Sequence, residues 1–125
     1  MELNEEKLHK FLGKMVVEMG AAANGALIIL GDKLGLYKKL SSNGPMTSEQ
    51  LADGTGTTER YVREWLSAQA ASGFVEYHRE NENFSMTPEQ TAVFADENSP
   101  VLMTGAFYGI SSMYHDEPKI EHAFK

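Results

Sequence analysis

The chain has 125 residues, of which 42% are hydrophobic, and this length is typical of one domain with its own core. The formal net charge of −7 repels phosphate backbones and anionic membranes, so nucleic-acid binding would require a local basic stripe, and the sequence has none. The absence of cysteine excludes disulfides and thiolate chemistry. We find no signal peptide and no apolar stretch of about 20 residues, and therefore expect a soluble, cytoplasmic protein that does not contact membranes.

Residues 1–40 are predicted to form helices. From Leu3 to Met19, apolar residues recur at three- and four-residue steps, as on one stripe of an amphipathic helix: Leu8, Phe11, Leu12, Met15 and Met19. The following segment is apolar on nearly all sides from Ala26 to Leu30, and such a helix must be covered on several faces. A single small domain can hardly supply that cover, so we expect a dimer partner or a second domain.

Residues 47–87 have the pattern of a winged helix-turn-helix. A capping box at Thr47 begins a short predicted helix, and the glycine-rich residues 54–56 permit a tight turn. A second helix is predicted over residues 58–72, and two short strands flanking a polar loop follow it over residues 74–87. This order of elements predicts a hairpin wing beside two helices.

Residues 88–125 are predicted to be mostly helical as well. Pro88 lies in the first turn of a short helix that reaches about Ala95, and an apolar segment extends from residue 101 to 113. Pro118 is expected to interrupt the helical spacing before a last amphipathic turn. Since the chain stops at Lys125 without a glycine cap or polar tail, we expect it to be a fragment of a longer protein.

The charge of the helix-turn-helix disagrees with a DNA-reading role. Residues 47–87 contain three arginines, Arg60, Arg63 and Arg79, and no lysine. They also contain seven acidic residues: Glu49, Asp53, Glu59, Glu64, Glu76, Glu80 and Glu82. Arg60 and Glu64 are four residues apart, which predicts an ion pair within the helix. A protein that neutralises several phosphates needs several unpaired cations, so we do not expect nucleic-acid binding.

No group of residues in the sequence supports catalysis or metal binding. The four histidines lie on different predicted elements, and the serines near residue 111 lack the motif of an activated nucleophile. The segment 103–109 mixes small and aromatic residues, which favours close helix packing or a dimer seam over a ligand pocket. The candidate residues for such a seam, or for a lid over a substrate, are Phe107, Tyr108, Met113 and Tyr114.

Several short motifs in a fixed order resemble the N-terminal region of a family of bacterial S-adenosylmethionine-dependent methyltransferases. The motifs are GDKLGLY (31–37), GPMT (44–47), LA (51–52), ERYVREWL (59–66) and SGFV (72–75). In that family a winged-helix domain precedes a Rossmann-like catalytic domain. The resemblance implies a winged helix that serves dimerisation and covers the substrate side of an active site. It also implies S-adenosylmethionine as the cofactor of the full-length protein.

The chain lacks the glycine-rich cofactor motif of the family, so the resemblance implies no catalysis and no cofactor or metal binding by the chain itself. We therefore expect an α+β winged helix-turn-helix, mostly helical with one β-hairpin, flanked by N- and C-terminal helices that form a homodimer seam. The Rossmann-like catalytic domain would follow in a longer protein. Two alternatives remain open: a dimeric transcription regulator of the multiple-antibiotic-resistance type that reads DNA with residues 58–72, and a stand-alone interaction module.

Overall fold

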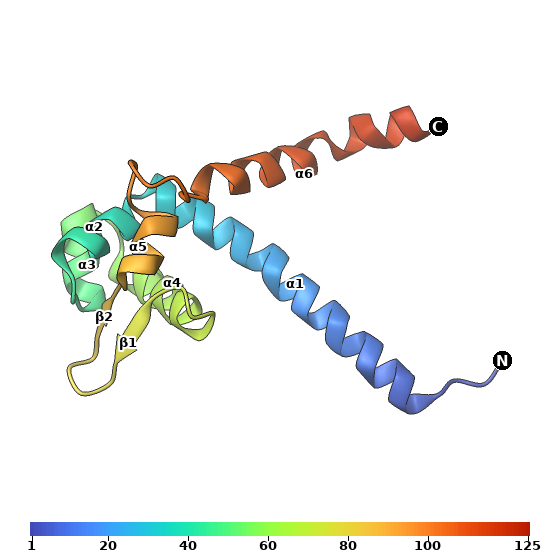
Figure 1. Cartoon of the computed structure of the whole chain (residues 1–125), viewed down its shortest axis with the longest axis horizontal. Coiled ribbons are helices and arrows are strands. Elements are labelled where there is room, and N and C mark those ends of the chain that lie inside the picture. The colour runs from blue at the N-terminus through green and yellow to red at the C-terminus, as the bar shows by residue number, and fades with distance from the viewer.

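A computed structural model describes all residues, 1–125, and contains six helices and one antiparallel hairpin. The elements are α1 (Glu5–Lys33), α2 (Leu36–Asn43), α3 (Ser48–Thr55), α4 (Glu59–Ala71), β1 (Glu76–His78), β2 (Asn83–Ser85), α5 (Pro88–Phe94) and α6 (Thr104–Phe124). Helices α2 to α5 and the hairpin form a compact unit, and α1 and α6 leave it as the two arms of a V (Figure 1). The predicted mostly helical winged helix-turn-helix with one hairpin is confirmed.

Side-chain caps and left-handed glycines set the boundaries of the short elements. Thr47 and Thr87 each form a capping box, in which a glutamine three residues later returns the hydrogen bond, at the starts of α3 and α5. Gly56 and Gly73 have φ values of 65° and 75° after α3 and α4, a conformation that glycine adopts without steric cost. These are positions that the sequence pattern predicts.

The core of the compact unit surrounds Tyr37 on α2. Its ring stacks on Phe94 of α5 at 4.8 Å between centroids and meets Trp65 of α4 edge-on at 4.9 Å. The wing adds to this core through Phe84 on β2, whose backbone pairs with Met46 before α3. The other buried apolar residues are Ile28, Leu36, Leu40, Leu51, Ala52, Val62, Leu66, Val75 and Ala95.

Both long helices continue past the points where the sequence pattern predicts a break. Helix α1 runs unbroken through Met19 and Gly20. A glycine within a helix costs only about 1 kcal/mol relative to alanine, and no capping residue ends the helix at this point. Helix α6 contains Pro118 in its interior, so the expected interruption there is wrong. A proline removes one backbone hydrogen bond, and on this solvent-exposed helix water is available to the freed carbonyl.

Helix α1 is long and apolar enough to cross a membrane by length and composition alone. This differs from the expectation that no apolar stretch of the sequence approaches about 20 residues. Only 11% of the apolar window is buried in the structure. Its C-terminal part nevertheless packs on the compact unit through Ile28 and Gly31, which are buried there. Most of the uncovered apolar surface of α1 therefore lies in its N-terminal part, and Leu30, 47% exposed, adds to it near the other end.

Candidate functional site

Helix α1 is anchored to α4 by a hydrogen bond and a close contact. The indole Nε1 of Trp65 donates to the main-chain carbonyl oxygen of Leu27, at 2.8 Å. One turn later, Gly31 lies against the rings of Trp65 and Tyr37, where a Cβ atom would come within 3.0 Å of both. This glycine allows α1 to approach the core closely, and the direction in which the rest of α1 extends is therefore set by the winged helix.

Helix α6 is anchored to α1 at the vertex of the V. The Tyr108 hydroxyl donates to Asp32 Oδ2 at 2.7 Å, and the Lys33 ammonium lies 5.7 Å from the centre of the same ring. The hydrogen bond to Asp32 raises the pKa of Tyr108 above its usual value. Phe107 packs against Gly25, where α1 has no side chain. These contacts fix where α6 departs from α1.

A small apolar hollow of about 130 Å³ lies at the vertex, between the two helices. It is lined from α1 by Ala22, Gly25, Ala26 and Ile29, and from α6 by Phe107, Ile110, Ser111 and Tyr114. Beyond this hollow the helices diverge (Figure 1). The vertex is therefore the last point at which α1 and α6 of one chain cover each other.

Beyond the vertex, α1 presents an unbroken apolar stripe to solvent. Every residue of α1 before Asn24 is exposed. The stripe alternates steps of four and three residues and continues into the vertex: Leu8, Leu12, Met15, Met19, Ala22, Ala26 and Ile29. Such a seven-residue spacing is typical of helices that pack along their length on another helix. The residue pattern alone predicts the first half of this stripe, to Met19, but not its continuation into the vertex.

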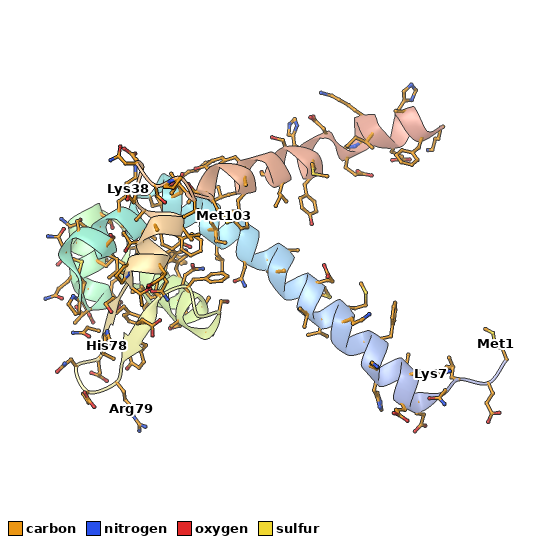
Figure 2. The ribbon with its side chains drawn as sticks, viewed as in Figure 1. Met1, Lys7, Lys38, His78, Arg79 and Met103 are labelled. Carbon is orange, nitrogen blue, oxygen red and sulfur yellow. The ribbon has the colours of Figure 1, made fainter.

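The outer part of α6 presents a second uncovered apolar face. It is hollowed over a volume of about 720 Å³ and is lined by Ile110, Met113, Tyr114, Glu117, Ile120, Glu121 and Phe124. Met113 and Tyr114 are 64% and 70% exposed. In Figure 2 no other segment covers the side chains along the two arms, and Lys7 lies near the free end of α1. The two apolar faces together form the candidate site, which we call the open V.

The structure divides the four predicted seam residues into two pairs. Phe107 and Tyr108 are half-buried and hold α6 against α1. Met113 and Tyr114 lie on the uncovered part of α6, and only Tyr114 also reaches the vertex hollow. The sequence pattern places Ile120 and Phe124 on a last amphipathic turn, but it does not group them, or Ile110, with Met113 and Tyr114. Their i, i+3 and i+4 spacing could have revealed them if α6 had been predicted to continue through Pro118.

The helix-turn-helix face has few free positive charges. Arg63 Nε lies 3.6 Å from Glu59 Oε1, one turn earlier on α4. The predicted pair of Arg60 with Glu64 does not form, and the ion pair of this helix joins Arg63 to Glu59. Arg60 is therefore the free cation of α4, and the adjoining wing loop adds Arg79 beside two glutamates. One or two cations on an acidic module are few for a face that would contact several phosphates.

A cleft of about 630 Å³ separates α4 from the wing. It is lined by Thr47, Ser48, Glu49, Arg63, Ser67, Ala70, Tyr77, Asn81, Glu82 and Phe84. The cleft holds more carboxylates than cations, which disfavours a phosphate or carboxylate ligand. No group of three or more histidine, cysteine, aspartate or glutamate side chains is arranged to hold a metal ion. The histidine nearest to a carboxylate, His115, lies 3.1 Å from Asp116 on the exposed side of α6.

Solved structures contain the same fold, and two of the three that follow are described as O-methyltransferases. The chain superposes on PigF with SAH with a TM-score of 0.74 and 14% identity, covering 90% of this chain and 32% of that one. For the mitomycin 7-O-methyltransferase MmcR the TM-score is 0.68 at 22% identity, with 78% and 29% covered. For an O-methyltransferase family protein from Burkholderia thailandensis it is 0.68 at 14%, with 100% and 34% covered.

The chain spans about a third of the length of these structures. At identities this low, the structural likeness shows the fold alone. No curated protein matches the chain. A family model does match: the Rv2258c-like winged HTH domain, over residues 22–96. This range runs from the vertex of the V through α5 and contains the complete compact unit. The chain therefore belongs to the family of Rv2258c-like winged helix-turn-helix domains.

Proposed function

We propose that this chain is the non-catalytic dimerisation and substrate-covering domain of an S-adenosylmethionine-dependent methyltransferase of the cytoplasm. The observation that carries the proposal is the open V, whose two arms expose continuous apolar faces while the winged helix beside them has a well-covered core. A soluble monomer rarely leaves such a surface open, so it marks an interaction site. A second copy of the chain is the partner that we propose for it.

The likeness to methyltransferase structures supports the enzymatic context. Two of the three are described as O-methyltransferases, and PigF is described with SAH. By this proposal the cofactor S-adenosylmethionine is bound by a catalytic domain outside residues 1–125. The open V and the cleft beside the wing offer this chain no glycine-rich phosphate or nucleoside cradle.

Two measurements on the chain test the proposal. Sedimentation equilibrium should give a dimer at micromolar concentration, because the open V is too apolar to stay solvated. A monomer at all concentrations would refute the dimerisation role. Sequencing of the gene beyond the Lys125 codon should reveal a strand followed by a glycine-rich turn of the Rossmann type. An open reading frame with a basic domain in that place would contradict the methyltransferase context.

A DNA-binding regulator is the competing function, and the charge of α4 separates the two. Since Arg63 is paired with Glu59 and the wing is acidic, we expect no salt-dependent association with duplex DNA at low ionic strength. Fluorescence anisotropy with a labelled duplex measures this directly. Tight binding that weakens steeply with added salt would favour the regulator.

A further inference from the structure

We propose that the N-terminal arm of α1 from a second copy lies on the uncovered apolar face of α6, with Lys7 and Lys14 of one copy beside Glu117 and Glu121 of the other. This inference rests on the proposed dimerisation and specifies which surfaces meet. It follows from charge placement on the two uncovered helices.

The apolar face of α6 contains a carboxylate without a partner. Glu117 lines the same hollow as Met113, Tyr114 and Ile120 and belongs to no ion pair. Glu121, one turn later, also lines the hollow and contacts only the terminal Lys125, at 2.6 Å. Covering these carboxylates with a purely apolar helix would be costly, because a charge removed from water needs a compensating charge. An occupant of this face must therefore bring cations.

Helix α1 carries cations in the required place. Lys7 and Lys14 lie seven residues apart on one edge of the helix, on either side of Phe11 and beside the apolar stripe. Glu18 continues the same edge one turn later, so the cations are confined to the N-terminal half of the exposed arm. Both lysines are exposed, and neither belongs to an ion pair. Figure 2 shows Lys7 near the free end of α1, remote from the winged helix. An apolar stripe bordered by lysines complements an apolar face that contains glutamates.

The two surfaces cannot meet within one chain, because α1 and α6 diverge from the vertex (Figure 1). They can meet between two copies, since each copy carries both surfaces. The lengths permit this contact: at about 1.5 Å per residue, the exposed arm of α1 over residues 5–23 spans about 28 Å, which is enough to cover the roughly 21 Å of α6 beyond residue 110. Insertion of each α1 arm into the other copy's V would build a four-helix bundle with two equivalent contacts.

Paired charge reversals test this arrangement. One variant carries Lys7→Glu with Lys14→Glu, and a second carries Glu117→Lys with Glu121→Lys. Each alone should dissociate more readily, with a dimer Kd raised about tenfold or more, because like charges face each other at both contacts. An equimolar mixture of the two should form a heterodimer with a Kd near that of the unmodified chain, since both of its contacts regain opposite charges.

The mixture distinguishes contacts between copies from contacts within a copy. If the charges met inside one chain, combining all four substitutions in that chain would restore stability but mixing the two double variants would not restore association. Circular dichroism confirms that each variant remains folded, and Arg60→Glu with Arg79→Glu serves as a control for two charge reversals on the winged helix. Sedimentation of the separate and mixed samples gives the Kd values.

Two outcomes would overturn the inference in different ways. Dimers of unchanged Kd in both double variants would reject the α1–α6 contact while leaving the proposed dimerisation intact. A monomeric unmodified chain would reject the dimerisation itself, and the inference with it. Stronger association of either double variant with itself than with the other would also contradict the arrangement.

Discussion

The indole N–H of Trp65 on α4 donates to the carbonyl oxygen of Leu27 on α1, at 2.8 Å, and thereby joins the helix-turn-helix to the long arm. The carbonyl belongs to the interior of a helix, so the bond supplements the helical hydrogen bonds. Trp65 also packs edge-on against Tyr37 and covers Gly31. One side chain therefore connects the core of the winged helix with the helix that carries the exposed apolar stripe.

Replacing this tryptophan with phenylalanine should weaken the joint without unfolding the domain. Trp65→Phe removes the donor and part of the buried ring, and we expect a loss of about 1–3 kcal/mol in the free energy of unfolding. Urea denaturation measures the loss. Tyr61→Phe is the control, because Tyr61 lies on the same helix and is exposed, so its change should stay within about 0.5 kcal/mol. Equal effects of the two substitutions would contradict the role assigned to Trp65.

Replacing two glycines of α1 with alanine should change the free energy of unfolding in opposite directions. At Gly31 a Cβ atom would approach Trp65 and Tyr37 to less than 3.0 Å, whereas at Gly20 no atom lies within 4 Å. Gly31→Ala should therefore destabilise the chain by about 1–3 kcal/mol through overpacking. Gly20→Ala should stabilise α1 by about 0.5–1 kcal/mol, because alanine is the better helix former. Thermal and urea unfolding of the two variants provide the comparison, and a stabilising Gly31→Ala would show that α1 sits farther from the core.

Local sequence signals predicted the winged helix well. The capping boxes at Thr47 and Thr87 and the left-handed glycines at positions 56 and 73 depend on interactions within a few residues. For this reason they can be recognised without knowledge of the tertiary structure. The same signals placed the hairpin between residues 74 and 87, although the paired strands are shorter than the apolar pattern suggested.

The open V was harder to predict because it depends on the continuity of two long helices. A glycine at position 20 and a proline at position 118 are local signals for a break, and in both cases the helix continues. The bond of Tyr108 to Asp32 joins residues far apart in the sequence, which no local pattern contains. The ion pair of α4 was assigned to the wrong register because both Glu59–Arg63 and Arg60–Glu64 have a four-residue spacing.

Tyr37 should make the domain sensitive to alkaline pH. Burial first, and then the negative charge of Asp32, raise the pKa of this phenol well above its usual value of about 10. Above pH 10 the unfolded chain releases a proton that the folded chain retains, so stability is full below pH 10 and falls as the pH rises. The expected slope from this group approaches about 1.4 kcal/mol per pH unit. Urea denaturation between pH 8 and about 11 measures it.

The control for this pH dependence removes both members of a buried pair. The Tyr37 hydroxyl donates to Gln69 Oε1, and Gln69 Nε2 is buried without a partner. Tyr37→Phe alone would leave the amide wholly unpaired, so Tyr37→Phe with Gln69→Leu is the better variant. It should lose the part of the alkaline slope that Tyr37 contributes, while Tyr108 and the other titrating groups remain in both proteins. An unchanged slope in the double variant would assign the effect to other groups.

Two equally exposed residues on opposite sides of α1 provide the most direct test of the apolar stripe. Met19 and Val17 are 71% and 70% exposed, so neither contributes much to the fold of the single chain. Met19 lies on the stripe that runs into the vertex hollow, whereas Val17, two residues earlier, points to another side of the helix. If the stripe is covered by a second copy, Met19→Asp places a carboxylate in the seam and Val17→Asp leaves it in water. We expect Met19→Asp to shift the chain to monomer, with a dimer Kd raised at least about tenfold, and Val17→Asp to sediment as the unmodified chain. Equal dissociation by both substitutions would indicate that loss of helix propensity, rather than burial of the stripe, controls association.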